Sequence, residues 1–439
     1  MLKTLINAWK VKDIRTKILY TLLLVVVYRL GCFIPVPGVN AAVIGEYAQK
    51  YDILNFLNLL SGGSFSQFTI FAMGISPYIT GSIIMQLLAI AIPSLERLGK
   101  EEDGRQKIER ITRYVGIGLA LVQSIGIIVS LGSGVVVDTS FLTYATIGLT
   151  CTAGTAFLVW MGERITEKGI GNGVSMIIFV SICSQVPRVV IQYFSDVFIL
   201  GTKQWWILPI MIVIALILIV GIVAVDRAVR RIPVQYAKKV VGRKMYGGQT
   251  SHIPLKANAN GVMPLILAMT IIQFPTMILQ IADSSGYAAM SEWLTNRATN
   301  ITSVGWFTKF FMQFMSQGQA IYYVIYALLI LAFAYFYTTI TFNPVEISKN
   351  LQQNGGFIPG IRPGKSTSDY LAKITNRLTL FGAVFLTIIA IIPAVLLGAF
   401  GQASVFGPTS LLIMVSVALE TNEQLESMML MRHYKGFLG

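Results

Sequence analysis

Apolar and polar positions alternate along this chain on the scale of whole membrane spans. Because about 20 consecutive apolar residues cross a bilayer as a helix, long apolar runs predict spans. Strong runs cover residues 18–36, 114–132, 206–226, 258–282, 318–340 and 377–398. Weaker or interrupted runs cover residues 70–92, 145–162, 171–187 and 404–421. The pattern predicts an all-α polytopic membrane protein with about ten transmembrane helices.

One stretch between the first two runs does not fit a simple span. Residues 56–68, which include "LLSGGSFSQF", are too short and too rich in Ser, Gly and Gln to cross a bilayer alone. We expect a re-entrant half-helix that enters and turns back. Such backbone is tolerated at membrane depth only where protein or water, not lipid, surrounds it.

Composition and charge support this interpretation and orient the chain. Of its 439 residues, 54% are hydrophobic and 12% are charged, which is typical of an integral membrane protein. With ten spans both termini lie on one side, and the segments on that side carry 28 of the 34 Lys and Arg residues. Because basic residues accumulate in cytoplasmic loops, we expect both termini in the cytosol.

Two cytosolic loops are larger than a simple turn requires. Residues 227–257 carry eight Lys and Arg residues, so this loop either docks an anionic partner or anchors the chain at lipid headgroups. In residues 341–377 a short helical start precedes a Gly/Pro tip that projects Arg362. The tip "PGIRPGKS" nearly matches a phosphate-binding loop. Pro359 replaces its first Gly and the pattern predicts no preceding strand, so nucleotide binding is not expected.

The residues needed for catalysis or metal binding are missing. The chain has two His residues, and it contains neither a HExxH motif nor a pair of carboxylates within a span. Its three Cys residues indicate neither a disulfide framework nor a zinc site. We therefore expect no catalytic residue, no metal and no cofactor. The spans also lack the ionisable residues that ion-coupled carriers keep at mid-membrane, which favours a passive conduit.

Several long motifs, in order along the whole chain, resemble one family. "LLSGGSFSQF", "GISPYITGSIIMQLL", "ITEKGIGNGVSMIIF", "YAKKVVGRKMYGGQTSHIPLKANANGVMP" and "GGFIPGIRPGKST" are similar to bacterial SecY, the central subunit of the Sec protein-conducting channel. The resemblance implies two inverted five-helix halves around a central pore. The halves would be residues 1–200, with a plug at about 56–68, and residues 201–439, with the loops 227–257 and 341–377.

The resemblance also implies a function, partners and a location. Such a channel translocates unfolded secretory polypeptides across the bacterial plasma membrane and releases membrane segments laterally into lipid. It is not an enzyme. Its partners would be SecE and SecG in the membrane, the SecA ATPase, the ribosome through its RNA, signal sequences and nascent polypeptides, and the lipid bilayer. The alternative is a secondary carrier of small organic solutes with broken helices, which would require a charged residue at mid-span.

The site residues implied by the resemblance fall into four groups. The plug residues are Leu59, Leu60, Ser61, Gly62, Gly63, Ser64 and Phe65. The aliphatic pore ring is Ile75, Ile79, Ile178, Ile182, Ile266 and Ile413. The lateral gate would be closed by polar contacts of Gln86, Thr270 and Gln273, which could instead bond locally to backbone. Docking of SecA or the ribosome would use Arg243, Lys244 and Arg362.

Overall fold

The structure is a computed structural model whose described part falls into two compact units. The described residues are 2–41, 43–45, 57–58, 60–131, 134–136, 138, 140–199, 206–236, 239–241, 244–246, 250–258, 261–269, 271–272, 320–399 and 408–435. The first unit holds the described residues up to 199 and those from Val417 onward. The second unit holds the described residues from Trp206 to Ile272 and from 320 to Ser416. The proposed boundary between halves near residue 200 stays a prediction.

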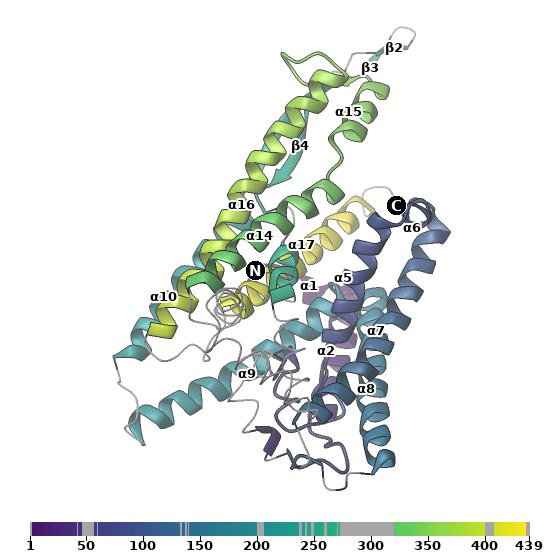
Figure 1. Ribbon diagram of the computed structural model, residues 1–439. Coiled ribbons are helices and arrows are strands. Elements are labelled where there is room, and N and C mark those ends of the chain that lie inside the picture. Colours follow the sequence, from purple (N-terminus) through teal and green to yellow (C-terminus); the bar gives the residue numbers. More distant parts are fainter. Residues whose placement is uncertain are drawn as a thin grey trace, which may run out of the picture. The chain divides into compact units, whose positions relative to one another are not determined.

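The first unit is helical. Its helices are α1 (Leu2–Lys10), α2 (Lys12–Gly31), α5 (Ser76–Ala91), α6 (Pro93–Lys100), α7 (Glu102–Leu131), α8 (Phe141–Lys168) and α9 (Gly173–Phe198). Helix α7 packs between α5 and α8, and α8 also packs on α2 and α9 (Figure 1). A Cβ added at Gly81 of α5 would lie 3.0 Å from the Cα of Gly116 on α7, so glycine lets these helices approach closely.

Two local signals shape this unit. Helices α5 and α6 are bent by 100° at Pro93, which occupies the first position of α6. The predicted spans 145–162 and 171–187 are joined by a short turn, since α8 ends at Lys168 and α9 begins at Gly173. Gly171 in this turn has a φ of +82°. The Asn172 Oδ1 accepts hydrogen bonds from the backbone N–H groups of Val174 and Ser175 and caps α9.

The second unit combines long helices with a small sheet. Its helices are α10 (Ile207–Asp226), α14 (Ala320–Thr341), α15 (Pro344–Gln353), α16 (Lys365–Ala399) and the first part of α17 (Pro408–Lys435). Helix α14 runs along α16 (Figure 1). The later part of α17 belongs to the first unit, where Leu425 shares an apolar cluster with Ala8, Ile14 and Ile170.

The large basic loop forms antiparallel strands, which the sequence analysis did not predict. Strands β1 (Val229–Tyr236), β4 (Thr250–Lys256) and β5 (Gly356–Phe357) form a sheet in the order β4-β1-β5. Strands β2 (Lys239–Val241) and β3 (Lys244–Tyr246) form a separate pair. The expectation that no strand precedes Pro359 is therefore wrong, because β5 lies just before it. The missing first Gly of a phosphate-binding loop still stands against nucleotide binding.

Strand β1 alternates buried and exposed residues as a strand should, but it contains Pro233, and only its pairing with other strands explains why the proline is tolerated. Its burial pattern alternates around Ile232 and Val234, which is typical of a half-buried strand. Pro233 cannot donate a ladder hydrogen bond, so a proline here usually demotes a strand to a sheet edge. At Pro233 the strand pairs with β4 alone, since β5 reaches only Gln235 and Tyr236. The missing N–H therefore costs little at this position.

The number of membrane spans is partly tested. Within the described residues five helices are long and apolar enough to cross a membrane, and the bent pair α5/α6 makes a sixth when counted as one span. They lie in α7, α8, α9, α14 and α16, in or near the predicted runs. Helix α10 contributes a shorter apolar segment, Ile212–Asp226. The full count of ten stays a prediction.

Candidate functional site

The predicted plug segment is one helical turn followed by tight turns. Residues 57, 58 and 60 are helical, and turns run from Ser61 onward; Leu59 lies outside the described residues. Gly62 and Gly63 have φ values of +68° and +89°, which favour glycine. A Cβ added at Gly62 would lie 3.1 Å from the Cα of Ser181. Conformation and space therefore both require glycine there, and the half-helix is shorter than expected.

Helix α2 holds this turn through two neighbouring side chains. The Tyr28 hydroxyl donates to the Ser61 carbonyl oxygen at 3.1 Å and lies 2.6 Å from the Ser181 Oγ. The Arg29 Nη1 donates to the Gly62 carbonyl oxygen at 3.3 Å and to the Ser184 Oγ at 2.9 Å. Tyr28 is buried, and its ring stacks on that of Phe71 with centroids 5.8 Å apart.

Helix α9 presents a polar stripe to the same turn. Ser181, Ser184, Gln185 and Arg188 recur at helical spacing, so they share one face of an otherwise apolar helix. The Gln185 Nε2 donates to the Asn58 carbonyl oxygen at 3.4 Å. A Cβ added at Gly63 would lie 2.7 Å from the Gln185 Nε2 and 3.0 Å from the Arg188 Nη1. The sequence analysis missed this stripe, although its spacing was a readable signal.

These contacts supplement backbone hydrogen bonds within the turn, in which the Asn58 carbonyl oxygen accepts from the Gly63 N–H at 2.9 Å and the Ser61 carbonyl oxygen accepts from the Ser64 N–H at 3.4 Å. The carbonyls of Asn58, Ser61 and Gly62 accept from side chains of α2 and α9. The last carbonyls of a helix otherwise need a cap, a ligand or water. The turn therefore links α2 to α9 mainly through directional hydrogen bonds. We call Asn58, Ser61–Gly63, Tyr28, Arg29 and the α9 stripe the plug junction.

Immediately after the plug junction the chain enters an apolar core. Phe65 and Phe68 are 0% and 1% exposed. They belong to a buried cluster with Ile44, Ile128 and Ile147, among others. Phe68 has a φ of +42°, an uncommon value for a bulky residue that surrounding packing must enforce. Phe65, predicted as part of a mobile plug, is thus a core residue of the first unit.

The plug junction lies beside two of the predicted pore-ring residues. Ile75 directly follows Gly74, whose added Cβ would lie 3.4 Å from the Cα of Ser61. Ile182 directly follows Ser181, which shares the Tyr28 hydroxyl with Ser61. Ser61 thus lies next to Gly74, the neighbour of Ile75, and is linked through the Tyr28 hydroxyl to Ser181, the neighbour of Ile182.

The ring positions are shielded to different extents. Ile75, Ile178, Ile182 and Ile413 are buried, with exposed fractions of 4%, 7%, 4% and 4%. Ile79 and Ile266 are half-buried. In contrast, Ile84 on α5 and Ile271 are 36% and 40% exposed. Ile75, Ile79, Ile178 and Ile182 belong to the first unit and Ile266 and Ile413 to the second, so a ring that joins all six stays a prediction.

The predicted lateral gate is largely untested. Gln86 is exposed on α5. Thr270 and Gln273, its expected partners, lie outside the described residues. The described helix at residues 263–269 nevertheless confirms that the span predicted from 258 begins as a helix.

The predicted docking tip is rigid and exposed. Its Gly360 and Gly364 have φ values of +82° and +97°. The Gly364 carbonyl oxygen accepts from the Ser348 Oγ at 2.7 Å, and the Arg362 carbonyl oxygen accepts from the Thr367 Oγ1 at 2.9 Å. These bonds fix the backbone while the Arg362 side chain stays exposed. Lys244 lies in β3, and Arg243 lies outside the described residues.

The tip rests on a compact apolar base. One buried apolar cluster joins β1, β4 and α16. Its residues include Ile232, Val234, Leu255, Leu371 and Ile374. Gly356 of β5 lies against the Tyr236 ring, with an added Cβ at 2.9 Å from Cε1. We call β1, β4, β5, α15 and the first turns of α16 the sheet head.

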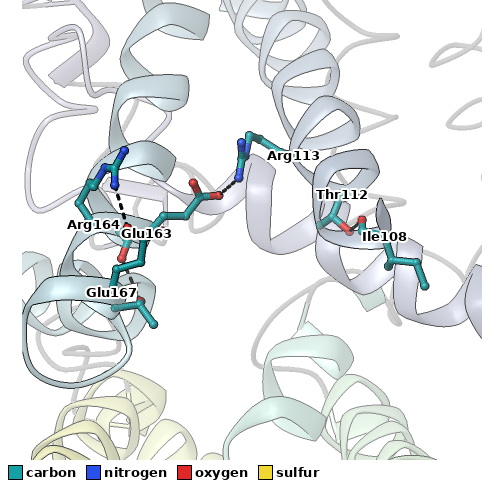
Figure 2. A network of polar contacts seen from close by, with 8 residues as sticks. Ile108, Thr112, Arg113, Glu163, Arg164 and Glu167 are labelled. Atoms are coloured by element: carbon teal, nitrogen blue, oxygen red, sulfur yellow. Dashed lines mark hydrogen bonds and ion pairs between the residues drawn. The ribbon is translucent and has the colours of Figure 1, made fainter. Parts of the chain in front are cut away.

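A charge network joins two helices of the first unit. Figure 2 shows Arg113 of α7 and Glu163 of α8 pointing toward each other, with an ion pair at 2.5 Å. On α8, Arg164 pairs with Glu167 one turn away at 2.8 Å. Thr112 donates its hydroxyl to the Ile108 carbonyl oxygen within α7. Since the paired side chains are 34–59% exposed, water screens them and each pair stabilises only weakly.

This arrangement defines a class of protein before any comparison. The described residues contain no group of three or more His, Cys, Asp or Glu side chains able to hold a metal ion. They place instead a polar turn between membrane-length helices, next to aliphatic side chains. The fold is that of a polytopic membrane protein such as a channel or carrier, and the re-entrant segment stays a prediction.

Comparison with known proteins narrows this class to one family. The SecY family model matches residues 69–422. A protein translocase subunit SecY from Halalkalibacterium halodurans is 41% identical over 449 residues, with 100% of both chains covered. The chain therefore belongs to the SecY family.

Solved structures agree on the fold. One concerns a SecY protein whose plug domain stabilises the closed state of the translocation channel and maintains a membrane seal. It is similar with a TM-score of 0.61 and 18% identity, over 94% of this chain and 92% of that one. Sec61 in a canine ribosome–channel complex from the endoplasmic reticulum gives 0.60 and 16%, with the same coverage. At these identities the likeness establishes the channel fold.

Proposed function

We propose that this chain is the pore-forming subunit of a protein-conducting channel. Unfolded secretory polypeptides cross the membrane through it, and membrane segments leave it sideways into lipid. The observation that carries the proposal is the plug junction, a polar turn suspended between α2 and α9 beside Ile75 and Ile182. In a SecY-family chain this is the element expected to open when a polypeptide enters.

The bonding of the plug junction suits reversible opening. Its carbonyls accept hydrogen bonds that are each worth about 0.5–1.5 kcal/mol in net stability. When the turn leaves, water or the passing polypeptide can take over the same donors and acceptors. Movement that stops before the buried Phe65 keeps that side chain in the core, and the apolar side chain that leaves the core is Leu57, which is only partly buried against it. The mobile part is accordingly the stretch from residue 57 to Gly63.

Sealing of the idle pore is assigned to the ring of Ile75, Ile79, Ile178, Ile182, Ile266 and Ile413. A narrow apolar constriction excludes ions by dewetting and makes no directional bonds to a passing chain. The half-buried state of Ile79 and Ile266 supports side chains that face a space rather than a packed core. The lateral gate is assigned to Gln86, Thr270 and Gln273.

The sheet head is assigned to docking. Arg362 is exposed on a fixed backbone, and the neighbouring strand β1 carries the exposed Arg230 and Arg231. Such a surface attracts anionic partners, including the phosphates of ribosomal RNA and acidic protein surfaces. We propose the ribosome and the SecA ATPase as partners here, with SecE and SecG as membrane subunits. The chain would lie in the bacterial plasma membrane with both termini in the cytosol.

Reconstitution tests the proposal directly. Proteoliposomes that hold this chain with its small membrane subunits should protect a secretory precursor from external protease when SecA and ATP are present. Protection should disappear when SecA is left out or when the precursor lacks a signal sequence. Protease protection that does not depend on SecA, or uptake of small organic solutes instead of the precursor, would contradict the proposal.

A further inference from the structure

Asp226 is a carboxylate in an unfavourable place. It is the last residue of α10, which has no basic residue in its last turn. The C-terminal end of a helix carries partial negative charge, so an acidic side chain there is destabilising unless other groups bind it. In this structure both of its oxygens are bound. The Oδ1 accepts from the Asn258 Nδ2 at 3.2 Å, and the Oδ2 accepts from the Ser416 Oγ at 2.8 Å.

The two partners belong to the segments that carry the second unit's ring residues. Asn258 lies eight positions before Ile266, in the turn that leads into the helix at residues 263–269. Ser416 lies on α17 three residues after Ile413, so both side chains share one face of that helix. The Asp226 carboxylate therefore links two segments. Its Oδ1 binds Asn258, ahead of the helix that carries Ile266, and its Oδ2 binds Ser416 on the helix that carries Ile413.

The backbone around Asn258 leaves its side chain little freedom. The Ala257 N–H donates to the Ala228 carbonyl oxygen at 2.8 Å, two residues after Asp226. On the opposite side, a Cβ added at Gly382 of α16 would lie 2.9 Å from the Ala257 carbonyl oxygen. Asn258 itself is 9% exposed. Its amide is thus aimed at Asp226 by a backbone that is fixed on two sides.

A cavity beside this turn makes the carboxylate more important. The cavity has a volume of about 290 Å³, and its lining includes Asn258, Pro264 and Gly382. Pro264 lies two residues before Ile266, so the start of the ring helix borders this cavity. On the cavity side the helix makes fewer van der Waals contacts than in a filled core. The hydrogen bond from Asn258 to Asp226 is then a main restraint on the start of the helix.

We propose that Asp226 is a positioning residue that sets where Ile266 and Ile413 stand in the closed pore. The proposal rests on the pore function and deepens it. Asp226 touches neither the polypeptide nor the ring side chains. It acts through Asn258 and Ser416, and its loss lets the two ring-bearing segments move independently. The idle channel should then leak ions and accept precursors with defective signal sequences.

Single-channel recording on the reconstituted complex tests this. We expect Asp226→Ala to raise resting ion conductance roughly tenfold, because hydrogen bonds to a charged group are the stronger ones. Glu109→Ala is the matched control. It removes the same charge from an exposed position of α7, and it should leave conductance unchanged. Asp226→Ala channels that are folded and as tight as wild type would overturn the proposal.

Ser416→Ala provides a second, milder variant that keeps the carboxylate. It should raise conductance by a smaller factor in the wild-type background and have no further effect in Asp226→Ala, since coupled residues are non-additive. Additive effects would contradict a shared role. If Asp226→Ala does not fold, Ser416→Ala alone decides. If Ile413→Ser channels leak ions but Asp226→Ala and Ser416→Ala channels do not, this inference is refuted and the proposed pore function is not. If Ile413→Ser channels do not leak, the assignment of the isoleucine ring is refuted.

Discussion

The plug junction of the first unit and the sheet head of the second each position a turn of the chain, yet different forces hold them. The plug junction is held by hydrogen bonds from Tyr28, Arg29 and Gln185 to backbone carbonyls. The sheet head is held by a strand ladder and by buried apolar residues such as Ile232 and Leu371, at 2% and 0% exposed. Water can replace the hydrogen bonds of either region, but it cannot replace the burial of apolar side chains that holds the sheet head.

This difference matches the tasks we assign to the two regions. A part that must leave its place repeatedly should lose only bonds that solvent can re-form, and each of these is worth about 0.5–1.5 kcal/mol. A part that presents Arg362 in one direction should not open at all. Burying one Leu or Ile side chain stabilises by about 1.5–3 kcal/mol, and its loss cannot be compensated by water. The chain thus separates a releasable element from a permanent one.

Breaking the apolar core of the sheet head should give the largest effect. Leu371→Ala leaves a cavity in a fully buried site, so we expect the free energy of unfolding to fall by about 2–5 kcal/mol. Limited proteolysis and thermal unfolding of the purified complex measure this. The control is Val345→Ala on α15, a 65% exposed position that should change stability by less than about 0.5 kcal/mol. Equal sensitivity of both variants would contradict a rigid head.

The ring positions next to the plug junction should be sensitive in conductance rather than in stability. Ile178→Ser together with Ile182→Ser should raise resting conductance about tenfold or more, because a polar constriction wets. The same double change at Ile84 and Ile271, both partly exposed, should not. Ile177, at 3% exposed, is as buried as Ile178 and Ile182, so Ile177→Ser is the control for the loss of packing and should not raise conductance either. Single-channel recordings with equal leak from both sets would refute the ring assignment.

Reversing the charge at the tip of the sheet head should affect docking only. Arg362→Glu should slow SecA-driven and ribosome-coupled translocation, since a buried Arg contact at an interface can be worth about 2 kcal/mol or more. Thermal stability should stay unchanged because the side chain is exposed. Lys349→Glu makes the same charge change on the exposed face of α15. A normal rate with both partners, or an equal loss from Lys349→Glu, would exclude a specific role for Arg362.

Removing one hydroxyl from the plug junction should have a smaller effect, and it should make opening of the idle channel more frequent instead of slowing translocation. Tyr28→Phe keeps the ring that stacks on Phe71 but deletes the bonds to Ser61 and Ser181. At about 0.5–1.5 kcal/mol the closed plug should open roughly 2- to 12-fold more often. Tyr114→Phe, at a 72% exposed position, is the control. Brief conductance bursts in recordings report the openings. An unchanged burst frequency would show that the hydroxyl does not hold the plug.

The sequence predicted features set by local signals better than features set by tertiary packing, in both regions. The apolar runs predicted helices such as α8 and α9, and Gly360 and Gly364 predicted the stiff turn at Arg362, because these signals are local. Strand β1 was not predicted, since Pro233 argues against a strand unless its one-sided pairing is known. Phe65 was assigned to the mobile plug because nothing local reveals its burial partners. The α9 stripe had a helical spacing, but its partners, the Asn58 carbonyl and the side chains of Tyr28 and Arg29, are set by tertiary packing.

The Arg113–Glu163 ion pair provides the weakest contact for the comparison between the plug junction and the sheet head. Like the plug junction, this pair consists of polar contacts that water can replace, but it joins two helices, α7 and α8, that are not assigned to move (Figure 2). If water-replaceable contacts are weak in general, a double-mutant cycle with Arg113→Met and Glu163→Gln should give a coupling free energy of only about 0.2–1 kcal/mol. The cycle is read from thermal or denaturant unfolding, at low and at high salt. High salt should reduce the coupling, because these side chains are 41% and 34% exposed. The Arg164–Glu167 pair on one helix serves as the comparison and should give no more than about 0.5 kcal/mol.

A coupling free energy of several kcal/mol that does not change with salt would show that a polar contact can hold two helices of this chain together permanently. The distinction between releasable and permanent elements would then need another physical basis.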